Sequence, residues 1–93
     1  MIGAMRKSTH TSEYAALRDE LRTARDRAGL SQRDLAAILK VPPSWIAKVE
    51  TGERRIDLVE FAWFMDACGA NAVTAFSRIA PARATRRPKG GRR

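Results

Sequence analysis

The sequence has very few of the residues from which catalytic and metal sites are usually built. It contains one cysteine, Cys68, and one histidine, His10, and neither stands in a nucleophile or metal-ligand pattern. A single cysteine also excludes an internal disulfide, which is typical of a protein from a reducing compartment. We therefore expect a protein that is not an enzyme and that carries no cofactor and no metal.

Long hydrophobic runs are missing as well. No stretch reaches the roughly 18 consecutive apolar residues that mark a membrane span, and residues 1–12 lack the apolar segment of a signal peptide. A chain of 93 residues with 44% apolar residues has the size and composition of one folded domain. The expected location is the cytoplasm, with no membrane partner.

The net charge of +8 is concentrated at the two ends of the chain. Between Glu13 and Ile79, ten Lys and Arg residues balance ten Asp and Glu residues, whereas the ends contain eight basic residues and no acidic one. We expect a flexible arm at 1–12, a folded domain at 13–80 and a disordered basic tail at 81–93, which is too rich in Pro, Gly and Arg to build a core. Such a tail either contacts nucleic acid or serves as a solubilising segment.

Apolar residues recur every three or four positions throughout the folded part, and no alternating strand pattern interrupts them. Capping signals divide this part into five helices, over about 12–28, 31–40, 43–51, 57–68 and 71–79. Ser31 with Asp34, and Asp57 with Glu60, have the spacing of capping boxes. The expected fold is all-α and compact, with short connections between the helices.

The fourth of these helices carries more apolar surface than one core-facing stripe requires. Its expected core face consists of Leu58, Phe61, Ala62 and Met65, and that of the last helix of Val73, Phe76 and Ile79. We expect a homodimer interface among the apolar residues of the two helices, with Val59, Trp63, Phe64, Phe76 and Ile79 as candidates. The alternative is that the compact core takes up all of them.

Residues 32–49 have the pattern of a helix-turn-helix. Two short helices that cross closely need a small residue at the crossing, an apolar residue in the turn and apolar residues that seat the second helix. The sequence supplies Ala36 at the crossing, Val41 in the turn, and Leu35, Ile46 and Val49 on the inner faces. Pro42 and Pro43 separate the two helices, because a residue before proline avoids the helical region and proline suits the first helical position.

Several short segments in and around this motif match a known pattern. They are Gly29-Leu30-Ser31-Gln32, Leu35-Ala36, Val41, Ile46, Lys48-Val49-Glu50 and Gly52-Glu53-Arg54-Arg55. With these residues the chain resembles the Cro/C1-type (XRE) helix-turn-helix family, from about Leu17 to Ile79. The resemblance implies a five-helix, lambda-repressor-like domain of bacterial or phage origin. It also implies a dimer that binds double-stranded DNA at a palindromic operator and regulates transcription, commonly as a repressor.

The chain departs from the family pattern around the turn. Lys40 stands where the family usually has glycine, and a left-handed conformation of a non-glycine residue costs about 1 kcal/mol. Pro42 and Pro43 stand where the family usually has a Ser or Thr cap followed by a polar residue that contacts a base. Pro43 has no side-chain atom that can hydrogen-bond to a base edge.

In this docking mode the second helix of the motif lies in the major groove, with its N-terminal residues at the base edges. The expected base-reading residues are Pro43, Ser44, Ala47 and Lys48, and Lys48 is the strongest candidate because lysine pairs with guanine O6 and N7. The expected phosphate contacts are Gln32, Arg33, Trp45, Thr51, Arg54 and Arg55. The resemblance further implies an ion pair between Arg25 and Glu50 that orients the base-reading helix.

The sequence leaves three functions open. The first is a dimeric, sequence-specific transcription regulator, and the second is an antitoxin-type module that binds a protein partner and regulates its own promoter. The third is RNA binding through the basic tail. Co-purification of a second small protein would favour the antitoxin, and competition by RNA would favour the third function.

Overall fold

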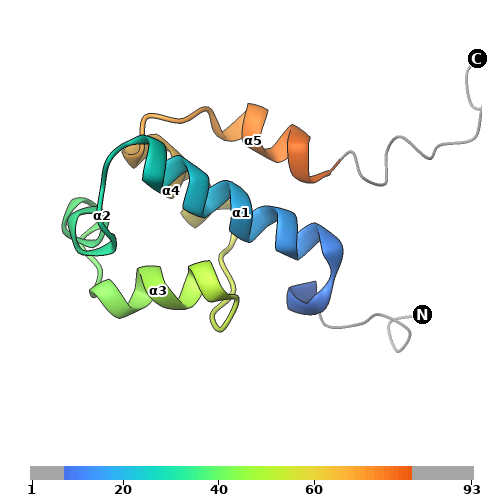
Figure 1. Cartoon of the computed structure of the whole chain (residues 1–93), viewed down its shortest axis with the longest axis horizontal. Helices are drawn as coiled ribbons and strands as arrows, with labels where there is room; N and C mark the ends of the chain where they lie inside the picture. Colours follow the sequence, from blue (N-terminus) through green and yellow to red (C-terminus); the bar gives the residue numbers. More distant parts are fainter. Residues whose placement is uncertain (1–7, 81–93) are drawn as a thin grey trace, which may run out of the picture.

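A computed structural model describes residues 8–80 of the chain (Figure 1). Within this range the chain forms helices and no strand, in the order α1 (Ser12–Arg27), α2 (Gln32–Leu39), α3 (Pro43–Thr51), α4 (Leu58–Ala67) and α5 (Ala72–Ile79), with a short 3-10 helix, Ser8–His10, before α1. The all-α fold with five helices is confirmed. The first seven residues of the expected arm and the expected basic tail at 81–93 lie outside the described residues.

The segment just before α1 is held to that helix. The Thr11 hydroxyl accepts a hydrogen bond from the Tyr14 amide at 3.1 Å and so caps α1. The Arg18 guanidinium reaches back to the carbonyl oxygen of Thr9 at 3.5 Å. Ser8–His10 and the cap Thr11 thus lie against the start of α1, within the segment that the sequence alone suggested as an arm up to residue 12.

Both expected capping boxes are present. At the start of α2, Ser31 Oγ accepts from the Asp34 amide at 2.9 Å, and the Asp34 carboxylate accepts from the Ser31 amide at 3.0 Å. The backbone hydrogen bond from Ser31 lowers the pKa of Asp34. At the start of α4, Asp57 and Glu60 exchange the same two bonds at 2.7 and 3.0 Å. These local bonds fix where α2 and α4 begin.

The turn between α2 and α3 follows the proline signals. Lys40 adopts a left-handed conformation with φ 60°, and the Val41 amide donates to the Ala36 carbonyl at 3.0 Å. Pro42 is extended, and Pro43 is the first residue of α3. Both features agree with the restricted backbone of a residue before proline and with the preference of proline for a helix start.

Helix α1 crosses the middle of the molecule, with α5 on one side of it and α3 on the other (Figure 1). Helix α2 lies at one end of the domain and packs against α3 and α4, and α4 also contacts α1 and α5 (Figure 1). The core contains Leu21, Leu35, Ala36, Ile46, Val49, Phe61, Phe64, Met65, Ala75 and Ile79. The apolar residues of the helix-turn-helix pattern thus seat α3 on this core.

The core-facing side of α4 differs from the one expected. Phe64 is fully buried and Ile79 is 8% exposed, whereas Leu58 is 72% exposed and Ala62 is also on the surface. Phe64 and Ile79 are therefore core residues, and the expectation that they belong to a dimer interface is wrong for both. The sequence pattern could not identify the buried side of α4, because nearly every residue of this helix is apolar. A spacing of three and four residues then fits more than one of its faces.

The last helix shows a similar shift. Val73 is 79% exposed and Phe76 is 51% exposed, and Ala75 and Ile79 are the residues of α5 that enter the core. The expected core face of Val73, Phe76 and Ile79 was right only for Ile79. Small Ala75 allows α5 to pack closely, which leaves the larger side chains outside.

We expect Phe64→Ala to lower the free energy of unfolding by about 3–5 kcal/mol, because it opens a cavity in a closely packed core. Urea unfolding followed by circular dichroism measures this change. Val73→Ala on α5 is the matched control, and it should stay within about 0.5 kcal/mol of the unmodified protein. Equal losses for the two variants would contradict the assignment of Phe64 to the core.

Candidate nucleic-acid interface

Helix α3 buries one side and exposes the other. Ile46 and Val49 have no exposed surface, and Glu50 is only 3% exposed. The expected base-reading residues share the opposite side, on which Pro43, Ser44 and Lys48 are exposed and Ala47 is half-buried. Successive residues of a helix are turned by about 100°, so these four side chains form one continuous outer strip along α3.

A buried ion pair holds the inner side of α3. The Arg25 guanidinium of α1 donates to both carboxylate oxygens of Glu50, with Nε–Oε2 at 2.6 Å and Nη2–Oε1 at 3.0 Å. Its third donor, Nη1, binds the Leu30 carbonyl at 2.9 Å. The hydrogen bond to Glu50 raises the pKa of Arg25 above its usual value. The ion pair implied by the family resemblance is present and two-pronged, which fixes the direction as well as the distance.

The expected phosphate contact at Gln32 has a different partner in this structure. Gln32 Nε2 donates to Glu50 Oε1 at 3.0 Å and completes the bonding of the buried carboxylate. Its neighbour Arg33 is exposed at the first turn of α2 and makes no hydrogen bond or ion pair with the described residues. Arg33 is therefore free to meet a phosphate, while the Gln32 side chain links α2 to α3.

Two further expected phosphate contacts also have partners within the chain. The Thr51 hydroxyl donates to the Lys48 carbonyl at 3.1 Å and accepts from the Glu53 amide at 3.4 Å, at the end of α3. Trp45 is half-buried and packs against the core, and the Arg54 guanidinium lies 5.1 Å from the centre of its ring. Of the pair Arg54 and Arg55, only Arg55 is without a side-chain partner in the described part of the chain.

The loop between α3 and α4 is anchored by Tyr14, a residue that the sequence does not mark as functional. The Tyr14 hydroxyl, on α1, accepts a hydrogen bond from the Ile56 amide at 3.2 Å. At the other end of the loop, the Arg54 amide donates to the Lys48 carbonyl at 3.1 Å. No local sequence signal predicts the first bond, because its partners are 42 positions apart.

Comparison with known proteins agrees with this geometry. Residues 16–75 match the family model of a helix-turn-helix domain. The fold is similar to that of an XRE-family like protein from Pseudomonas syringae pv. tomato str. DC3000, with 37% identity and a TM-score of 0.74 over 81% of this chain and 92% of that one. This chain belongs to the XRE family of helix-turn-helix proteins. No curated protein matches it.

Membership of the XRE family makes the protein a DNA-binding regulator, with α3 as its recognition helix. None of the described helices is long and apolar enough to cross a membrane. The outer strip of α3 is the exposed side of the second helix in this XRE-family helix-turn-helix.

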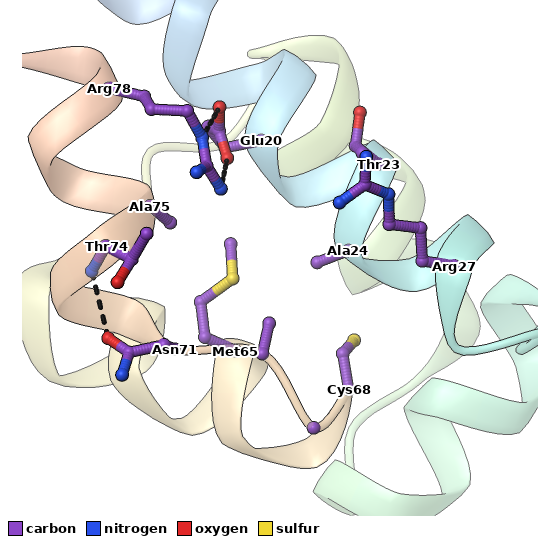
Figure 2. A pocket seen from close by; sticks show the side chains of 12 residues that line it. Glu20, Thr23, Ala24, Arg27, Met65, Cys68, Asn71, Thr74, Ala75 and Arg78 are labelled. Atoms are coloured by element: carbon purple, nitrogen blue, oxygen red, sulfur yellow. Dashed lines mark hydrogen bonds and ion pairs between the residues drawn. The ribbon is translucent and has the colours of Figure 1, made fainter.

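The XRE-family domain also has an open cavity of about 420 Å³ between α1, α4 and α5 (Figure 2). Met65 and Ala75 line it, and a two-pronged ion pair between Arg78 and Glu20, at 2.9 and 3.0 Å, spans one side. Cys68 also lines it, and burial raises the pKa of its thiol, which disfavours the reactive thiolate. None of the residues that line this cavity belongs to α2 or α3.

We expect Glu50→Ala to lower the free energy of unfolding by about 3–5 kcal/mol, because it leaves the mostly buried Arg25 guanidinium without its carboxylate. Chemical denaturation at neutral pH measures the loss. Glu20→Ala is the matched control, since it breaks a two-pronged pair with the more exposed Arg78 and should cost little. A loss for Glu50→Ala no larger than that for the control would show that the buried pair does not hold α3.

Proposed function

We propose that the protein is a homodimeric transcriptional repressor in the cytoplasm, and that it binds a palindromic operator through two copies of α3. The observation that carries this proposal is the outer strip of α3, held at a fixed rotation by the buried contacts of Glu50 with Arg25 and Gln32. Major-groove recognition requires a rigid helix with one exposed side that can contact base edges. Occupation of an operator by such a dimer suffices to block transcription.

The outer strip supplies a small but usable set of base contacts. Lys48 can donate to guanine O6 and N7, and the Ser44 hydroxyl can donate or accept. Ala47 and Pro43 offer only apolar contact, which suits the methyl group of thymine. We therefore propose that Lys48 contributes most of the discrimination between bases.

Phosphate contacts on both sides of the groove would position this strip. The side chains of Arg33, at the start of α2, and of Arg55, after α3, are exposed and make no hydrogen bond or ion pair with the described residues. The first-turn amides of α2 add partial positive charge next to Arg33. Such contacts set the register of the protein on the duplex and contribute affinity without reading sequence.

The exposed side of α4 supports the proposed dimer. Leu58, Val59 and Trp63 are 72%, 55% and 61% exposed and share this side with Ala62. An apolar strip of this kind is unusual on a monomer and is typical of an interaction surface. A two-fold axis beside α4 would bring the same strip of both subunits together, as in an isologous dimer interface.

Selection of bound sequences from a random duplex pool tests the base contacts. We expect a palindrome whose half-sites lie about ten base pairs apart. Lys48→Ala should weaken binding to that site by about 1–3 kcal/mol and relax the preference at one position of each half-site. Arg22→Ala removes a charge from an exposed position on α1 and should leave the selected sequence unchanged. The absence of any enriched sequence would contradict specific recognition.

Sedimentation equilibrium tests the dimer. We expect Trp63→Glu to shift the protein from dimer to monomer, because it places a charge in an apolar contact, while the free domain tolerates the change at an exposed position. Val73→Glu, at a more exposed position on α5, is the control and should leave the dimer intact. A monomeric unmodified protein that co-purifies with a second small protein would favour the antitoxin function instead.

A further inference from the structure

We propose that the two adjacent arginines after the recognition helix have different roles, and that Arg54 positions α3 while Arg55 contacts the DNA backbone. Family resemblance assigned both to phosphate. The inference rests on the proposed DNA contact of the α3–α4 loop and assigns different roles to two residues of that loop. Three contacts of Arg54 carry the argument.

The first contact joins Arg54 to the start of the recognition helix. Its guanidinium carbon lies 5.1 Å from the centre of the Trp45 ring, within the range of a cation–π interaction. Trp45 is the third residue of α3 and follows directly on Ser44, which belongs to the outer strip. The contact with Arg54 therefore acts on the N-terminal turn of α3, next to the outer strip.

The other contacts join Arg54 to the start of α4. Nη1 donates to the Arg55 carbonyl at 2.8 Å and lies 3.4 Å from Glu60 Oε1. The same Glu60 oxygen accepts the Asp57 amide at 3.0 Å in the capping box of α4. Arg54 thus bridges from the N-terminal turn of α3 to the N-terminal cap of α4 across the loop between them.

The bridge complements the buried ion pair. Glu50 holds α3 near its C-terminal end, while Trp45 with Arg54 holds it near its N-terminal end. A helix fixed at one end alone can still tilt about that point. Arg54 is therefore a positioning residue, since its guanidinium carbon lies over the Trp45 ring and its Nη1 contacts two protein oxygens.

Arg55 has the opposite surroundings. Its side chain is exposed and has no hydrogen bond, ion pair or ring contact with the described residues. Its carbonyl oxygen accepts the bond from Arg54, and the Ile56 amide that follows is bound to the Tyr14 hydroxyl at 3.2 Å. The backbone at Arg55 is thus fixed while its guanidinium is free, which suits a phosphate contact.

Arg54→Gln and Arg55→Gln are matched variants, because each removes one charge from neighbouring positions. The first measurement is the salt dependence of binding to a short duplex of random sequence. Arg55→Gln should reduce the slope of log K against log salt by about 0.9, the value for one lost phosphate contact. Arg54→Gln should reduce it by less than half as much. Equal reductions would overturn the division of roles.

The second measurement is amide hydrogen exchange of the free protein. Arg54→Gln should speed exchange of the hydrogen-bonded amides of α3 by about three- to tenfold relative to α5, while Arg55→Gln should not. Arg54→Lys should behave like Arg54→Gln, since lysine keeps the charge but loses the planar group that stacks and donates together. Unchanged exchange in α3 for both Arg54 variants would overturn the positioning role.

Neither measurement needs a palindromic operator or a dimer. Failure of the repressor proposal, seen as the absence of an enriched sequence, would therefore leave both results interpretable. Failure of the present inference would show instead as equal salt slopes or as unchanged exchange, with operator selection intact.

Discussion

The buried carboxylate of Glu50 is the constraint on which the recognition surface depends. A carboxylate with 3% exposure is costly unless it is paired and hydrogen-bonded. Arg25 from α1 and Gln32 from α2 supply that pairing, so three helices have to meet at one point. Because Glu50 lies on the inner side of α3, the pairing also sets the rotation of α3 about its own axis. That rotation turns Lys48 and the rest of the outer strip toward solvent.

The charge balance of the folded part is compatible with DNA binding because three of its acids near the proposed interface are bound internally. Asp34 caps α2 and has a lowered pKa through the bond from Ser31, Glu50 is buried in its ion pair, and Glu60 caps α4 and faces Arg54. Among the described residues, the exposed side chains of Arg33, Lys48 and Arg55 have no such partners. A neutral domain can therefore present a positive surface locally, since structural hydrogen bonds fix where its negative charge lies.

Much of the proposed interface could be predicted from the sequence. The hydrogen bonds within the protein that hold this interface could not. The outer strip of α3 was predicted from helical spacing, because Ile46 and Val49 define the inner side. The ion pair of Arg25 with Glu50 was predicted only through family resemblance. Gln32 and Arg54 were both assigned to phosphate, because a polar side chain near a recognition helix gives no local indication that its partner is another part of the same chain. The structure bonds both to protein atoms instead.

By itself, the sequence determined where each helix begins and ends, because caps and proline restrictions act within a few residues. The box of Ser31 with Asp34 and the left-handed Lys40 ahead of the prolines are of this kind. Only the tertiary structure decided which side of α4 is buried. Both Leu58 and Phe64 fit an apolar stripe, and close packing against α1, α2 and α5 accommodates Phe64 while Leu58 remains outside. Helical periodicity repeats along the chain, whereas the space available in a core exists only once the helices have met.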